Sequence, residues 1–174
     1  MSFCTMYWPP VGSMSRQQYV DLTRALADEY TRFLDSCVTR TTPITFLDLN
    51  DGLGLRMLAT ADSQGVGSIG RQVPTSDHSD AIGTCEPFLE KAGGTLFRSI
   101  VESHSCCVVN SHFYAGRTYF GNRGHGGSKL DYIVCPQGML HNVSSCRLAT
   151  HCVASRSNCS SYGTTHSAIM LYCT

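Results

Sequence analysis

The chain has 174 residues, and its 13 basic and 13 acidic side chains give a formal net charge of zero. This length suits one α/β domain with a substantial core, and the balanced charge excludes the global positive field that marks many nucleic-acid-binding proteins. No apolar run approaches the ~20 residues of a membrane span, and residues 1–10 lack the pattern of a secretory signal, so we expect an intracellular protein, nuclear or cytoplasmic.

The first half of the chain predicts one long helix and one buried strand. Ser15, with Gln18 three residues later, is typical of a helix start, and apolar residues then recur at gaps of three and four. This predicted buried face comprises Tyr19, Leu22, Leu26, Tyr30, Phe33 and Cys37. A β-prone run over 44–50 follows Pro43 and ends in polar residues, and the Gly- and Ser-rich stretch 52–83 indicates a long loop region.

The second half predicts another helix followed by several strands. The helix covers 95–104 with an inner stripe at Leu96, Phe97, Ile100 and Val101, and strands are expected at 106–110, 118–120, 143–150 and around Asp131 and His166. No repeat or linker divides the chain, so we expect a single domain over 1–174, with helices packed on mainly antiparallel sheets.

The ten cysteines show no C-x-x-C spacing, and several fall inside apolar runs. We therefore expect buried thiols. The alternative is a zinc site formed by Cys146, Cys152, Cys159 and His151, but structural zinc ligands usually come in close pairs and these gaps are wider.

An acid and a histidine on two of the later strands form the first functional hypothesis. Asp131 lies in the run Lys129–Val134, and His166 stands at the entrance to another apolar run. A carboxylate that holds an imidazole fixes its tautomer and prepares it for proton or phosphate chemistry. The alternative is that Asp131 ends a hydrogen-bond ladder and His166 is an ordinary strand-edge residue.

The order of short motifs along the chain resembles the endonuclease/exonuclease/phosphatase family. The motifs are Tyr7 in Met6-Tyr7-Trp8-Pro9-Pro10, then a helix, Asp48-x-Asn50, Asn110, Thr118, Asp131-Tyr132-Ile133 and His166. The order is most similar to that of the apurinic-type endonuclease domains of non-LTR retrotransposons. The resemblance implies a four-layer α/β sandwich that hydrolyses phosphodiester bonds of DNA with Mg²⁺ or Mn²⁺, and it allows a fused reverse transcriptase domain.

The resemblance also assigns roles to individual residues. It implies that Asp48 orients or deprotonates the attacking water, that Asn50 lies beside it, and that His166 contacts the scissile phosphate. It further implies that Asp131 holds the histidine and that the hydroxyl of Tyr7 approaches the phosphate. Alternatively, Asp48 and Asn50 form a simple turn, and Tyr7 only anchors a strand.

Three cations flank a glycine-rich stretch and could contact a nucleic-acid backbone, namely Arg117, Arg123 and Lys129. The alternative for them is a solvated loop. Ser76-Asp77-His78 also matches the family's closing Ser-Asp-His motif, but no apolar strand follows it, so we assign the histidine role to His166.

Two departures from the family pattern limit the expected activity. Thr165 stands where an acid normally precedes the histidine in the family. Only six residues precede Tyr7, so we expect this chain to lack the family's N-terminal strands with their asparagine and metal-binding glutamate. We therefore expect a partial four-layer α/β sandwich of the α+β class with little or no nuclease activity. The alternatives are a noncatalytic remnant that binds nucleic acid or a partner protein, and a phosphatase of the same superfamily.

Overall fold

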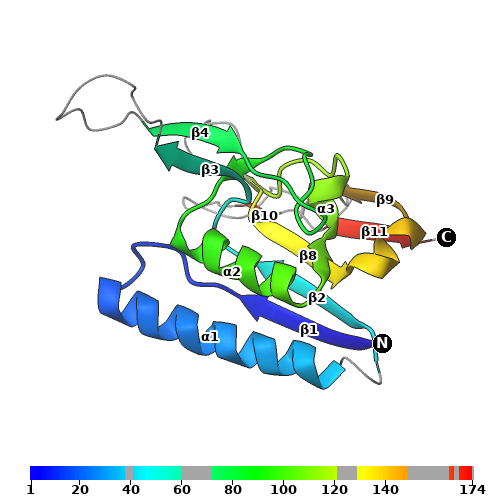
Figure 1. The fold of residues 1–174 in the computed structure, drawn as a ribbon, viewed down its shortest axis with the longest axis horizontal. Helices are drawn as coiled ribbons and strands as arrows, with labels where there is room; N and C mark the ends of the chain where they lie inside the picture. Colours follow the sequence, from blue (N-terminus) through cyan, green and yellow to red (C-terminus); the bar gives the residue numbers. More distant parts are fainter. Residues whose placement is uncertain (38–40, 60–71, 121–128, 149–164, 167–168, 174) are drawn as a thin grey trace, which may run out of the picture.

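The computed structural model describes residues 1–37, 41–59, 72–120, 129–148, 165–166 and 169–173. Its centre is a four-stranded sheet in the order β1-β2-β8-β6 (Figure 1). The strands are β1 (Ser2–Tyr7), β2 (Pro43–Asp48), β8 (Asp131–Pro136) and β6 (Cys106–Val108). Helices α1 (Arg16–Cys37) and α2 (Ala92–Ser103) cover one face of this sheet.

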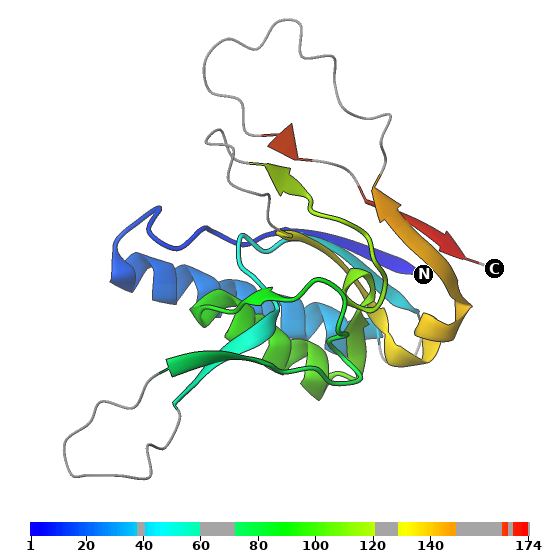
Figure 2. The same cartoon turned by 90° about the horizontal axis from the view of Figure 1, so that it is seen from above.

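Shorter β-pairs complete the structure. Strands β3 (Gly54–Ala59), β4 (Gln72–Ser76) and β5 (Phe88–Leu89) form a three-stranded sheet, and β7 (Tyr119–Phe120) pairs with β10 (Thr165–His166). Strand β9 (Val143–Leu148) pairs with β11 (Ile169–Cys173), on the side of the central sheet away from α1 and α2 (Figure 2). The remaining elements are α3 (Val109–His112) and the 3₁₀ helix η1 (Gln137–Asn142).

The predicted class is confirmed, because helices cover mainly antiparallel sheets. Among the described strands, only the pairs β1–β2 and β3–β5 are parallel. The prediction of a long loop over 52–83 is wrong for β3 and β4. These strands are stabilised by pairing with each other and with β5, a long-range contact that carries no local periodicity.

Helix α1 begins as predicted, but its buried face is rotated. The Ser15 hydroxyl accepts the Gln18 N–H at 3.3 Å, and the Gln18 side chain accepts the Ser15 N–H at 3.2 Å, which is a capping box. The buried residues are Tyr19, Thr23, Ala27, Tyr30, Leu34 and Cys37. Leu22 is exposed instead, and the adjacent stripe through Thr23 and Ala27 is buried.

Two apolar clusters lie on the two faces of the central sheet. The larger one fills the space under the helices, where the Phe97 ring lies 6.3 Å from the Trp8 ring and 5.9 Å from the Tyr30 ring. Each such aromatic pair stabilises the fold by ~0.5–1.5 kcal/mol beyond its buried area. The second cluster joins Ile44 and Ile133 of the sheet to Val143 of β9.

The prediction of buried thiols is confirmed for five cysteines: Cys37, Cys106, Cys107, Cys135 and Cys146. Cys4 and Cys85 are partly exposed. Of the zinc set considered above, His151, Cys152 and Cys159 lie outside the described residues. None of the helices in the described ranges is both long and apolar enough to cross a membrane.

Candidate functional site

Three residues far apart in the sequence meet at one end of the central sheet. Tyr7 is the register partner of Asp48 across β1 and β2, and Asp48 is the partner of Asp131 across β2 and β8. Directly opposite residues lie on the same face of a sheet, with Cα atoms ~4.5–5.5 Å apart. Tyr7, Asp48 and Asp131 therefore form a continuous row, called here the site row. Tyr7 is 60% exposed and both carboxylates are partly exposed.

The chain turns immediately after Asp48, and Asn50 fixes this turn. The Asn50 N–H donates to Oδ1 of Asp48 at 3.2 Å, and Nδ2 of Asn50 donates to the Trp8 carbonyl at 2.8 Å. Asn50 has a φ of 51°, a conformation that asparagine tolerates better than most residues. The turn considered in the sequence is thus present. Through it, Asn50 ties the end of β2 to the end of β1 and orients the carboxylate of Asp48.

Asp131 is held at its backbone by two buried side chains. Nδ2 of Asn110 donates to the Asp131 carbonyl at 2.9 Å, and the Thr118 hydroxyl accepts the Asp131 N–H at 3.1 Å. The same hydroxyl accepts the Leu130 N–H at 3.0 Å, and Oδ1 of Asn110 accepts the Ile133 N–H at 3.0 Å. Both side chains are fully buried. The motif order contained Asn110 and Thr118, but sequence reasoning gave neither a role, because only the fold brings them to β8.

His166 reaches this region through its backbone pairing. It is the register partner of Tyr119 in the β7–β10 pair, and Tyr119 follows Thr118, which holds Asp131. For His166 the structure describes this backbone pairing alone, so the predicted contact between Asp131 and the imidazole of His166 stays a prediction. The expected loss of activity from Thr165, which replaces the family's acid beside the histidine, also stays a prediction.

The three predicted nucleic-acid contacts have different outcomes. Arg117 is exposed, with its guanidinium carbon 5.9 Å from the centre of the Phe88 ring, while Arg123 lies outside the described residues. Lys129 is not available to a nucleic acid, because it is 1% exposed. Its Nζ lies 3.2 Å from Oε2 of Glu86 and donates to the Asn110 carbonyl at 3.1 Å. Burial lowers the pKa of Lys129, and the neighbouring Glu86 opposes this shift.

Sequence reasoning also missed a buried carboxylate close to the site row. Asp51 accepts the N–H groups of Gly52 at 2.8 Å, Lys91 at 3.1 Å and Gly94 at 2.8 Å. It therefore caps the N-terminus of α2 from a distant part of the chain. Burial raises the pKa of Asp51, and the three N–H donors oppose this shift. Both an Asp-Gly turn at 51–52 and a helix over 95–104 can be predicted from the sequence, but the contact between Asp51 and the start of α2 depends on the fold.

The second histidine motif lies elsewhere in the fold. Asp77 of Ser76-Asp77-His78 pairs with Arg56 at 3.0 Å on the exposed β3–β4 hairpin. His78 lines a polar cavity of about 480 Å³ together with His112.

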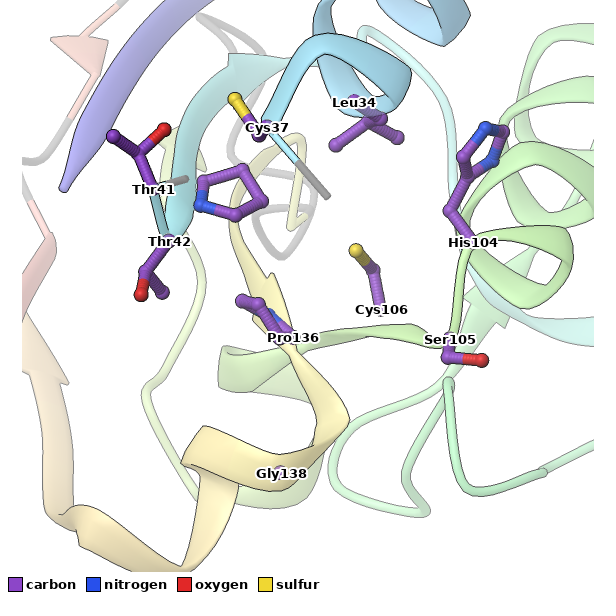
Figure 3. A pocket seen from close by; sticks show the side chains of 10 residues that line it. Leu34, Cys37, Thr41, Thr42, His104, Ser105, Cys106, Pro136 and Gly138 are labelled. Carbon is purple, nitrogen blue, oxygen red and sulfur yellow. The ribbon is translucent and has the colours of Figure 1, made fainter. Parts of the chain in front are cut away.

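A cavity of about 440 Å³ lies at the other end of the sheet from the site row (Figure 3). Pro43 and Pro136, at the opposite ends of β2 and β8 from Asp48 and Asp131, line it together with Cys37, His104 and Cys106. Burial is the main cause that raises the pKa of the Cys106 thiol, to about 11, so this thiol is protonated at neutral pH. The cavity thus offers no reactive thiolate at Cys106.

The donor set in the described ranges does not fit a complete divalent-metal site. The site row supplies two carboxylates, and nowhere in these ranges do three His, Cys, Asp or Glu side chains converge. Mg²⁺ in proteins is bound by one or two carboxylates with water and substrate phosphates. The described residues could therefore contribute ligands to an ion that water and substrate phosphates also bind, but they do not enclose an ion on their own.

Comparisons with known proteins identify the fold. No family model and no curated protein matches the chain. Among solved structures, the chain is similar to a 3′ phosphatase, NExo, from Neisseria bound to a product DNA hairpin, with a TM-score of 0.55 and 13% identity over 94% of this chain and 56% of the other. It is equally similar to the 3′-5′ exonuclease NExo from Neisseria meningitidis, with a TM-score of 0.55 and 12% identity over 95% of this chain and 57% of the other.

These similarities confirm the fold that the family resemblance implied. At such identities they establish the arrangement of the elements and not the chemistry. The chain spans little more than half the length of the two neighbours. The narrower resemblance to retrotransposon endonucleases stays a prediction.

Proposed function

We propose that the site row is the phosphodiester-binding edge of a nucleic-acid hydrolase of the endonuclease/exonuclease/phosphatase type. The observation that carries this proposal is the register that aligns Tyr7, Asp48 and Asp131 across three neighbouring strands. Like charges directly opposite each other destabilise a sheet. Two aligned carboxylates beside a phenol therefore favour a chemical role over a purely structural one.

In this proposal each residue has a role that its chemistry permits. The carboxylate of Asp48, oriented by the Asn50 N–H, positions and deprotonates a water molecule. The exposed Tyr7 hydroxyl donates to a non-bridging phosphate oxygen, and the His166 imidazole, held by Asp131, contacts the same phosphate. Asn110 and Thr118 are positioning residues, because they act through the backbone of Asp131.

DNA is the substrate class that we propose, for two reasons. The neighbouring 3′ phosphatase is bound to a DNA hairpin, and Arg117 places an exposed cation one residue before Thr118. Such a cation contributes to backbone binding without reading sequence. Arg123 belongs to the same proposed interface. Lys129 does not belong to it, because its side chain is buried beside Glu86.

We also propose that this chain alone turns over DNA slowly or not at all, with a requirement for Mg²⁺ or Mn²⁺. Support comes from the site row, which supplies two carboxylates, and from the incomplete ligand set in the described ranges. A noncatalytic remnant that binds nucleic acid, or a partner protein, is the second candidate, and the same incomplete ligand set favours it. A phosphatase of this superfamily and a retrotransposon origin with a fused reverse transcriptase domain stay expectations from the resemblance.

Two measurements on the same preparations test this proposal. Plasmid nicking in Mg²⁺, Mn²⁺ and EDTA should show little or no turnover. Metal-dependent nicking that Asp48→Ala abolishes would contradict the low-activity statement and establish the enzyme. In fluorescence anisotropy with a DNA hairpin, Arg117→Ala should weaken binding several-fold and lower its salt dependence. Arg32→Ala on the exposed surface of α1 is the matched control, and equal binding by both variants would refute the proposed interface.

A further inference from the structure

Two thiols face each other inside the central sheet. Cys107 of β6 and Cys135 of β8 are directly opposite in the antiparallel register, and their Sγ atoms lie 3.8 Å apart. Both residues are buried, with 0% and 2% of their surface exposed, and both thiols are free. The distance between the two sulfur atoms exceeds the ~2.05 Å of a disulfide bond by about 1.8 Å.

The backbone geometry of this pair suits a disulfide. The Val108 N–H donates to the Ala81 carbonyl at 2.8 Å and so points away from β8. Because hydrogen-bonded and non-bonded pairs alternate along antiparallel strands, Cys107 and Cys135 form a hydrogen-bonded pair, with Cα atoms ~5.5 Å apart. Disulfides usually join Cα atoms that are ~4.4–6.8 Å apart. Rotation of the two side chains can therefore close the bond while the strands stay paired.

The thiol next in the sequence lies on the other side of the sheet. Successive side chains of a strand point to opposite faces. Cys106 accordingly lies in the apolar cluster under the helices and lines the cavity of Figure 3. Cys107 and Cys135 lie in the cluster on the other face. Cys106 is thus a buried neighbour that cannot reach Cys135, which makes it a matched control.

The contact also makes the two thiols chemically unequal. The hydrogen bond with Cys135 lowers the pKa of the Cys107 thiol, and burial opposes this shift. The same hydrogen bond, together with burial, raises the pKa of the Cys135 thiol. The thiolate is the form of cysteine that attacks a peroxide. Cys107 is therefore the nucleophile of the pair, and Cys135 is the thiol that reacts second.

We propose that Cys107 and Cys135 are a site of reversible oxidation, at which hydrogen peroxide joins β6 to β8 through a disulfide. First the Cys107 sulfur attacks one peroxide oxygen, the O–O bond breaks, and the departing hydroxide takes the Cys107 proton, which gives a sulfenic acid and water. Then the Cys135 sulfur attacks the Cys107 sulfur, the S–O bond breaks, and the departing hydroxide takes the Cys135 proton. The two thiols lose two electrons and two protons, and one peroxide becomes two water molecules. A water-sized oxidant is required because both thiols are buried.

The disulfide constrains the segment that holds Asp131. The two cysteines are 28 residues apart, and the loop that they close contains Asn110 and Thr118, whose side chains bind the Asp131 backbone. Closing such a loop reduces the freedom of the unfolded chain, so the midpoint of urea unfolding should rise by on the order of 1 M. A midpoint that the cross-link leaves unchanged would contradict this constraint.

Peptide mass spectrometry of the full chain tests the proposed site. The reduced wild type is treated with hydrogen peroxide while folded, the remaining thiols are blocked with N-ethylmaleimide in urea, and the digest is analysed without reduction. A peptide that links Cys107 to Cys135 should be the main cross-link, and dithiothreitol should remove it. Recovery of both cysteines as blocked thiols, or a main cross-link from either of them to Cys146, would overturn the proposal.

Two matched variants separate this pair from general oxidation. Cys107→Ser should lose the cross-link, whereas Cys106→Ser, at an equally buried position on the opposite face, should keep it. Loss of the cross-link in both variants would count against the pair. If circular dichroism shows that Cys107→Ser does not fold, Cys135→Ala takes its place, and the wild-type cross-link still decides the question. The readout is independent of DNA binding and turnover, so the proposed function can fail without affecting it.

Discussion

Asp131 owes its position to side chains that lie outside its own strand. Strand β6 ends at Val108, so Asn110 replaces the missing strand with a side-chain amide that binds the Asp131 carbonyl and the Ile133 N–H. Thr118 supplies the acceptor for the N–H groups of Leu130 and Asp131. The backbone of Asp131 is thereby fixed at the start of β8, beside Asp48.

Thr118→Val tests whether the single hydroxyl oxygen of Thr118 holds the start of β8 in place. Valine has nearly the same shape, but it leaves the N–H groups of Leu130 and Asp131 without their acceptor in a buried position. Each unsatisfied donor should cost ~1–3 kcal/mol in the free energy of unfolding, measured by urea denaturation. Thr118→Ser keeps the hydroxyl and loses one methyl group, so it should cost only ~1 kcal/mol. Equal losses in the two variants would show that packing, and not the hydroxyl, holds this strand.

At the scale of elements, the sequence correctly predicted those features that depend on residues close together in the chain. The Ser15–Gln18 capping box predicted the start of α1, and the Phe97, Ile100 and Val101 stripe predicted the buried face of α2. Strands β3 and β4 were missed because their stability comes from pairing across a long connection. The site row could be expected only through the family resemblance, since its alignment depends on the order of strands in the sheet.

A buried ion pair ties α2 to the β3–β5 sheet. Nε of Arg98 donates to both carboxylate oxygens of Glu90, at 2.9 and 3.1 Å, and Oε1 of Glu90 accepts the Gly54 N–H at 2.8 Å. A nitrogen of the same guanidinium donates to the Asp77 carbonyl at 2.7 Å. One arginine thus connects α2, the start of β3 and the segment after β4.

Removing one member of this pair should be more damaging than removing both charges. Arg98→Met leaves the Glu90 carboxylate buried without its partner and should cost ~3–5 kcal/mol in urea denaturation. Adding Glu90→Gln keeps an acceptor for the Gly54 N–H and removes the buried, unpaired negative charge. The double variant should therefore recover part of the stability that Arg98→Met loses. Arg32→Met, in an exposed pair with Glu29, should cost ~0–1 kcal/mol. Additive effects of Arg98→Met and Glu90→Gln would contradict this coupling.

At the scale of the molecule, the central sheet joins two apolar clusters into one body. Trp8, the chain's one tryptophan, is fully buried under the helices. Cys107, Cys135 and Cys146 lie in the cluster on the other face. Because the strands of β2, β6 and β8 contribute to both clusters, neither face of the sheet can lose its packing without disturbing the other.

We therefore expect the chain to unfold in one cooperative transition. In urea, the change in Trp8 fluorescence should coincide with the change in far-ultraviolet circular dichroism, as two-state unfolding requires. Pulsed alkylation followed by peptide mass spectrometry should show Cys107, Cys135 and Cys146 becoming reactive at the same urea concentration, because their labelling requires the cluster on the other face to open. Labelling of these thiols well before the fluorescence change would instead show that β9 and its cluster form a separate, weaker unit. The site row, on β1, β2 and β8, would then keep its strands after the layer formed by β9 had opened.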